Sequence, residues 1–281
     1  MFIDTSSKES LRAGLSDCLN IPISVVEERV LDAGRKAEAG MCFDTVVFYE
    51  EMEKLLQTYT PEILDKISFY HMSRRLISET NNGGYSLYHL LLSKNEISDF
   101  LNTKDFEFKA VDDRVVPLYK GRQIIPLEDS NDARINYLKL RLGYFQKRKD
   151  FCFNGFAFKE HLIKNKYAKI LVDGPEFMVK LAEYVNAPAI INDYKDISKF
   201  YCIRYDVPFD MVIFDGYDNL QNSEKQIHYL KACLLRMLDD INRTGRESDS
   251  DNIIIRLRDD CSMSDKYYIQ KEIIKDEAVY G

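Results

Sequence analysis

Residues 106–127 read FEFKAVDDRVVPLYKGRQIIPL, and this stretch decides the fold class. It contains three short runs rich in Val, Ile, Phe and Tyr, namely FEFKAV, VVPLY and RQIIPL. Such runs are typical of β-strands, and Lys120-Gly121 between the last two indicates a tight turn. The stretch therefore predicts an antiparallel meander that ends in a hairpin. Helical patterns stand on both sides of it without a regular strand–helix–strand period, so the sequence predicts an α+β fold with mixed, largely antiparallel sheets and packed helices.

The chain changes character near residue 60. Residues 1–58 carry apolar side chains at helical spacing, with possible capping boxes at Ser6/Glu9 and Ser24/Glu27. We therefore predict a helical N-terminal segment, 1–58, and an α+β domain, 60–281. Within the second domain the patterns predict helices from Thr60 and over 85–102, 131–143, 175–185 and 223–243, a loop over 244–251, and strands over 67–73, 151–158, 201–207, 211–215, 252–258 and 267–274.

The composition is that of a globular protein. Apolar residues make up 45% and charged residues 30%, and no apolar run approaches the roughly 20 residues that a membrane span needs. The six cysteines are scattered without zinc-ligand spacing, so we expect reduced thiols, no metal, and a soluble protein of the cytoplasm. A net charge of −7 disfavours nonspecific binding to nucleic acids and anionic membranes.

Three segments carry residues suited to chemistry, and FYHMSRR (69–75) is the first. His71 ends a predicted strand, and Ser73 and Arg74 follow it closely. Imidazole, hydroxyl and guanidinium groups together can hold the hydroxyls and phosphates of a nucleotide. The alternative is a structural histidine at a strand end beside solvated arginines.

The second segment is FNGFAF (153–158), with Tyr167 downstream. Gly155 inside an aromatic strand indicates close approach of another backbone or of a ligand. Phe156 and Tyr167 could then sandwich a flat heterocycle. An ordinary core strand with a bulge at Gly155 explains the pattern equally well.

The third segment is YYIQKEII (267–274). Strict alternation places Tyr268, Gln270 and Glu272 on one face of a strand. The carboxylate could stabilise a developing cation, and it could bind a ribose hydroxyl together with the amide. An exposed strand face without function is the alternative.

In this order the three segments resemble the ADP-ribosyltransferase fold of the His–Tyr–Glu class. In that class a His lies on an early strand, an aromatic strand and a helix form the nicotinamide pocket, and a Glu lies on a late strand. FYHMS, the helical GYSLYHLL, NGFAF with Tyr167, and YIQKEII are similar to these parts, so the resemblance covers about residues 65–281. Two positions differ, because Met72 and Ala157 stand where the class commonly has Gly and Tyr.

The resemblance implies transfer of ADP-ribose from NAD to an unknown acceptor. NAD is then a substrate, and no metal is needed. Glu272 would stabilise the ribosyl cation that forms as nicotinamide leaves, and His71 would hold the ribose or the carboxamide. The remaining residues that we predict for NAD binding are Ser73, Arg74, Gly155, Phe156, Tyr167 and Gln270.

Two other functions stay open at this stage. One is a noncatalytic interaction or regulatory protein that uses its N-terminal helices as the partner surface. The other is a metal-dependent nuclease, because Glu107-Phe108-Lys109 has the Glu-x-Lys spacing of such enzymes, with Asp99 or Asp105 as a second ligand. An acidic residue facing Glu107 from a neighbouring strand would favour the nuclease.

Overall fold

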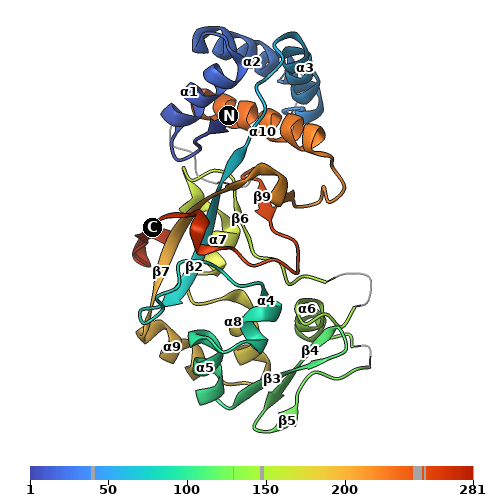
Figure 1. The fold of residues 1–281 in the computed structure, drawn as a ribbon, viewed down its shortest axis with the longest axis vertical. Helices are drawn as coiled ribbons and strands as arrows, with labels where there is room; N and C mark the ends of the chain where they lie inside the picture. Colours follow the sequence, from blue (N-terminus) through green and yellow to red (C-terminus); the bar gives the residue numbers. More distant parts are fainter. Residues whose placement is uncertain (39–41, 129, 146–148, 243–248, 250, 281) are drawn as a thin grey trace. The chain divides into compact units, whose positions relative to one another are not determined.

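The computed structural model describes residues 1–38, 42–128, 130–145, 149–242, 249 and 251–280 (Figure 1). Helices and largely antiparallel strands mix along the chain, so the predicted α+β class is confirmed. The chain divides into two compact units, and strand β2 (Lys66–Leu76) passes from one to the other between Tyr70 and His71. None of the described helices is long and apolar enough to cross a membrane.

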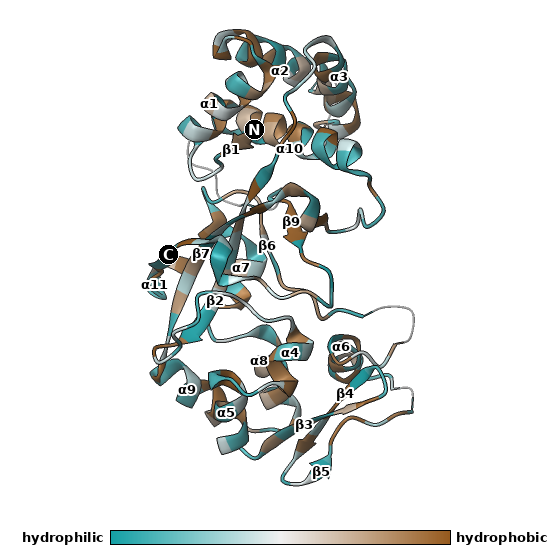
Figure 2. Ribbon diagram, viewed as in Figure 1, coloured by the Kyte–Doolittle hydropathy of each residue, from teal (hydrophilic) through white to brown (hydrophobic). Residues whose placement is uncertain are grey.

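The first unit contains Met1–Tyr70, Phe156–Asn165 and Asp206–Ile255. Its helices are α1 (Lys8–Leu19), α2 (Ile23–Ala37), α3 (Thr45–Thr58) and the long α10 (Asn222–Asn242). Hydrophobic and hydrophilic residues mix along each of them (Figure 2), and α10 packs against the other three. Gly34 lets α2 approach α10 closely, since a Cβ there would lie 2.8 Å from Leu238 Cδ1. The predicted helical segment 1–58 thus shares its unit with a helix from far along the chain.

Local capping differs from the prediction at three helix starts. Ser7 and Ser10 form the capping box of α1, in place of Ser6 and Glu9. Helix α2 begins directly after Pro22, so Ser24 lies inside the helix and caps nothing. The helix predicted from Thr60 is wrong, because residues 60–65 form no helix and lead straight into β2. The fixed φ angle of Pro61 is compatible with an extended backbone as well as with the first turn of a helix.

Short strands complete the first unit. Strand β1 (Phe2–Ile3) runs parallel to β2, and β6 (Asn154–Phe156) runs antiparallel to β2 with Phe156 opposite Tyr70. Strands β8 (Ile213–Phe214) and β9 (Ile254–Arg256) follow on the far side of β6. From β2 onward the pairing order is therefore β2-β6-β9-β8. The predicted strand 151–158 is therefore shorter than expected, and most of the predicted loop 244–251 lies outside the described residues.

The second unit contains His71–Gly155, Lys166–Tyr205 and Arg256–Gly281. Its helices are α4 (Leu87–Leu92), α5 (Glu96–Thr103), α6 (Ala133–Arg141), α7 (Lys166–Ile170), α8 (Glu176–Tyr184), α9 (Ala189–Asp196) and α11 (Glu277–Tyr280). Its strands include β3 (Phe106–Val111), β4 (Arg114–Tyr119), β5 (Arg122–Gln123), β7 (Ser198–Pro208) and β10 (Tyr268–Ile273). The meander β3-β4-β5 confirms the hairpin predicted across Lys120-Gly121.

One apolar core joins most elements of the second unit. It includes Phe100, whose ring meets Tyr194 edge-on at 5.2 Å between centroids. The single helix predicted over 85–102 is in fact two, because Asn95 starts a new helix by capping α5 with Ser98 in a capping box. The Asn95 side chain accepts hydrogen bonds from the backbone N–H groups at the start of α5, so the chain begins a second helix there instead of continuing the first.

Candidate functional site around His71

His71 lies on β2 beside the segment that leads into β6. Its ring centroid is 4.2 Å from that of Phe153, and its Nδ1 is 2.7 Å from the backbone oxygen of Asn154. A carbonyl oxygen only accepts, so Nδ1 carries the proton and donates. Burial of the ring, aided by the positive charge of Arg75, lowers the pKa of His71 to about 3, against the opposing effect of the Asn154 bond. The imidazole is therefore neutral, and its Nε2 presents a lone pair.

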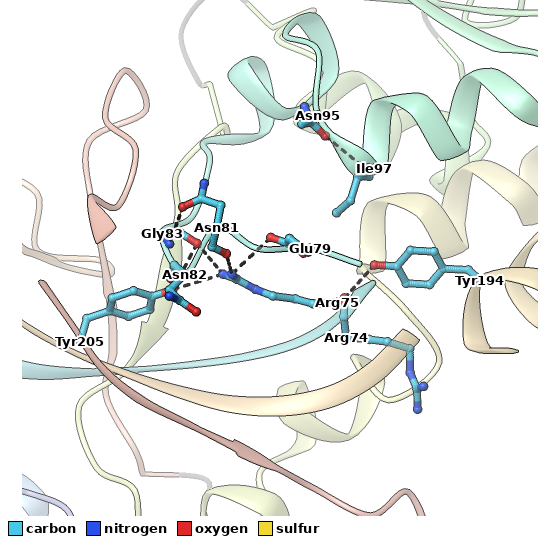
Figure 3. Close-up of polar contacts among 10 residues, drawn as sticks. All are labelled: Arg74, Arg75, Glu79, Asn81, Asn82, Gly83, Asn95, Ile97, Tyr194 and Tyr205. Carbon is cyan, nitrogen blue, oxygen red and sulfur yellow. Dashed lines mark hydrogen bonds and ion pairs between the residues drawn. The ribbon is translucent and has the colours of Figure 1, made fainter. Parts of the chain in front are cut away.

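Strand alternation decides which neighbours accompany His71. Successive side chains point to opposite faces, so Ser73 and Arg75 share the face of His71, whereas Arg74 lies on the other. In Figure 3 the side chains of Arg74 and Arg75 leave β2 in different directions. We call the set His71, Arg75, Glu79, Phe153 and Tyr205 the His71 face.

Arg75 holds the segment that follows β2. Its Nη1 lies 3.3 Å from Glu79 Oε1, and its Nη2 donates to Gly83 O at 2.8 Å and to Tyr205 Oη at 3.2 Å (Figure 3). Tyr205 Oη in turn donates to Asn82 O at 2.6 Å. One buried guanidinium and one buried phenol thus fix the path of residues 79–83.

Gly84 then brings this segment against Phe153. Its backbone forms a bridge with Met263, with N–H···O distances of 2.9 and 2.6 Å. A Cβ at Gly84 would lie only 2.0 Å from the Phe153 ring. Phe153 is 5% exposed and also meets Tyr205 edge-on at 5.9 Å. The absence of a side chain at Gly84 therefore lets Phe153 sit beside both His71 and Tyr205.

Glu79 carries the carboxyl group of the His71 face. Its side chain is 10% exposed. Burial raises the pKa of Glu79 above its ordinary value, and the charge of Arg75 offsets part of that rise. Oε1 faces Arg75, while Oε2 has no hydrogen-bond partner within the part of the chain that the structure describes.

Arg74 does not share this site. Its Nε donates to Val172 O, its Nη1 donates to Ser198 O, and its Nη2 pairs with the carboxylate of Asp276. With a side chain only 4% exposed, it binds other parts of the protein. The predicted role of Arg74 in nucleotide binding therefore needs correction, and Arg75 is the arginine beside His71.

The structure brings the predicted histidine strand and glycine strand side by side. Strands β2 and β6 pair directly, with Tyr70 opposite Phe156. Because paired residues share a face, Phe156 lies with Tyr70 on the side of β2 away from His71. Gly155 alternates to the same side as His71, so of the two only Gly155 fits the predicted pocket wall.

A β-bulge changes the predicted face of β10. Tyr268 lies opposite Tyr205, but Gln270 lies opposite Arg204, the next residue on β7. The extra residue reverses the alternation, so the prediction that Tyr268, Gln270 and Glu272 share one face is wrong. Gln270 and Glu272 do share a face, with Gln270 Nε2 3.3 Å from Glu272 Oε1.

The bulge also separates Glu272 from the His71 face. Tyr205 meets the Phe153 ring that contacts His71, whereas Glu272 lies opposite Cys202 on the other side of β7. Strand β7 stands between β10 and β2 in the sheet. His71 is thus linked through the Phe153 ring to Tyr205, whereas the pairing of β10 with β7 puts Glu272 on the opposite face of β7.

Tyr167 lies on α7 with 59% of its surface exposed. Its contact with nicotinamide stays a prediction. Ser73 lies on the correct face of β2 and is partly exposed, so its predicted contact also stays open.

The residue that faces Glu107 of the nuclease motif from strand β4 is not acidic. Glu107 lies opposite Leu118 on β4, and Asp105 precedes β3 with a φ of 64°. Among the described residues no group of three His, Cys, Asp or Glu side chains could hold a metal ion. The neighbouring acid that would have favoured the nuclease does not face Glu107 from β4.

Sequence reasoning missed four members of the His71 face. Alternation from His71 could have selected Arg75 over Arg74. Phe153 lies one residue before β6. No sequence signal links Phe153, Glu79 or Tyr205 to His71, because these residues come together only in the tertiary structure. Comparisons of the chain with protein-family models, curated proteins and solved structures gave no match.

Proposed function

We propose that the protein is an NAD-dependent ADP-ribosyltransferase whose nucleotide site is built on the His71 face. The observation that carries this proposal is the direct pairing of the His71 strand with the Gly155 strand, with the His71 ring kept neutral by burial and oriented by its hydrogen bond to Asn154 O. A neutral imidazole with a free lone pair at Nε2 suits a ribose hydroxyl or a carboxamide N–H. The helix that the resemblance places after the histidine corresponds to α4.

The proposed reaction needs little beyond positioning and charge. The bond between ribose C1′ and the nicotinamide nitrogen breaks, nicotinamide leaves as a neutral molecule, and the ribosyl cation is captured by the acceptor. His71 would orient the nicotinamide riboside half of NAD, and a carboxylate would offset the cation. Glu272 remains the predicted carboxylate, although it lies on the opposite face of β7. The acceptor is unspecified, and the cytoplasm is the proposed compartment.

The test is a two-step measurement on the intact chain. NAD should raise the melting temperature, because a ligand that binds only the folded state stabilises it by mass action. The protein should then release nicotinamide from NAD when lysate supplies the acceptor. His71→Ala should abolish the NAD-dependent rise, whereas His228→Ala, on α10, should retain it. A wild-type protein that neither binds nor consumes NAD would refute the proposal.

A second candidate is a noncatalytic interaction protein with the N-terminal helices as its partner surface. The separation of Glu272 from His71 favours it, because a catalytic carboxylate should face the bound nucleotide. The two candidates predict different results. A wild type that binds NAD without releasing nicotinamide, together with a Glu272→Gln variant that binds NAD equally well, would support the noncatalytic protein.

A further inference from the structure

The carboxyl group of Glu79 is the unexplained polar group of the His71 face. Only one of its oxygens, Oε1, is engaged, at 3.3 Å from Arg75 Nη1. The other, Oε2, is buried and has no hydrogen-bond partner in the described ranges. A buried acceptor without a donor typically costs about 1–3 kcal/mol, and native structures rarely keep one without a reason.

The surroundings of Glu79 show why this oxygen points to a ligand. Arg75 and Lys271 attract the carboxylate, whereas Glu96 at the start of α5 repels it. The chain neighbours Ser78 and Thr80 are exposed, so the segment that carries Glu79 runs along the surface.

The rest of the face offers few donors of its own to Oε2. The Nη2 of Arg75 is taken by Gly83 O and Tyr205 Oη, and the hydroxyl of Tyr205 donates to Asn82 O. His71 presents a lone pair at Nε2 rather than a proton. The His71 face therefore presents acceptors, and the complementary ligand is one that carries hydroxyl or amide donors.

We infer that Glu79 binds the ligand directly, with Oε2 accepting a hydrogen bond from the nicotinamide riboside half of NAD. The donor is either a ribose hydroxyl or the carboxamide N–H. This inference rests on the proposed function. It adds to that function an acidic residue that the resemblance does not include and that, unlike Glu272, is paired with Arg75 of the His71 face.

The experiment is calorimetric titration of the wild type, Glu79→Gln and Glu107→Gln with NAD, ADP-ribose and nicotinamide. Glutamine keeps an oxygen for Arg75 but places an N–H₂ group where Oε2 stood, so a ligand donor would meet another donor. Losing a hydrogen bond to a charged acceptor should weaken NAD binding by about 10- to 100-fold. Glu107→Gln removes the same charge from β3 and should leave the affinity within about twofold.

The three ligands separate the two possible donors. A loss that extends to ADP-ribose identifies a ribose hydroxyl, and a loss that extends to nicotinamide identifies the carboxamide. A wild-type protein without NAD affinity would overturn the proposed function and this inference with it. A wild type that binds NAD, with Glu79→Gln binding equally well, would overturn this inference alone. If Glu79→Gln does not fold, Glu79→Asp, which keeps the charge and withdraws the oxygen, decides in the same way.

Discussion

Replacing Gly84 by alanine should destabilise the second unit and displace Phe153. The added Cβ would lie 2.0, 2.5 and 2.8 Å from three atoms of the Phe153 ring, far inside contact distance. The φ angle of Gly84 is outside the left-handed region, so the cost comes from the collision. The glycine backbone cannot retreat freely, because both of its hydrogen-bonding groups pair with Met263. Phe153 is 5% exposed and has rings of His71 and Tyr205 on its other sides.

Overpacking a filled core usually costs about 1–3 kcal/mol, and a contact this short places Gly84→Ala at about 3 kcal/mol or above. Urea unfolding would measure this as a lower midpoint at unchanged slope. Phe153→Leu removes the struck atoms, so Gly84→Ala should cost about 1–2 kcal/mol less in that background. Gly121→Ala is the comparison: its φ is +74° with open space around it, and about 1–2 kcal/mol of backbone strain is expected. A Gly84→Ala cost below about 1 kcal/mol, or no rescue by Phe153→Leu, would refute the argument.

Three further predictions concern His71, Arg75 and Gly34. The pKa of His71 is about 3 in the folded protein, so below pH 6.5 the unfolded chain binds a proton at His71 that the folded protein does not bind. The stability that the neutral ring contributes is therefore full above pH 6.5 and is lost as the pH is lowered. Relative to His71→Asn, the wild type should lose about 2 kcal/mol of its free energy of unfolding between pH 6.5 and 5, measured by urea titration. Arg75→Met should cost about 3–5 kcal/mol by leaving Glu79 buried and unpaired, and adding Glu79→Gln should recover part of that loss in a double-mutant cycle. Gly34→Ala should lower the melting temperature in the wild type but less in a Leu238→Ala background, because Leu238 Cδ1 is the atom that the new Cβ meets.

The sequence by itself determined the features that depend on neighbouring residues. The meander β3-β4-β5 with its turn at Lys120-Gly121, the helical character of residues 1–58 and the strand that contains His71 were all predicted from periodicity and turn chemistry. These patterns are short-range, because a strand alternates every two residues and a helix every 3.6, whatever surrounds them. The predicted fold class followed from the same local signals.

Only the tertiary structure decided how those elements combine into a site. A single extra residue between Tyr268 and Gln270 reversed the face of Glu272, and a one-residue shift leaves almost no trace in an alternating sequence. Phe153 and Tyr205 come from two stretches far from β2 and reach His71 and Arg75 only after folding, so no local pattern links them. Glu79 is distinguished by burial and by an unpaired oxygen, both of which are properties of packing. The identity of the strands was therefore local information, whereas the composition of the His71 face depended on which of their sides the fold brought together.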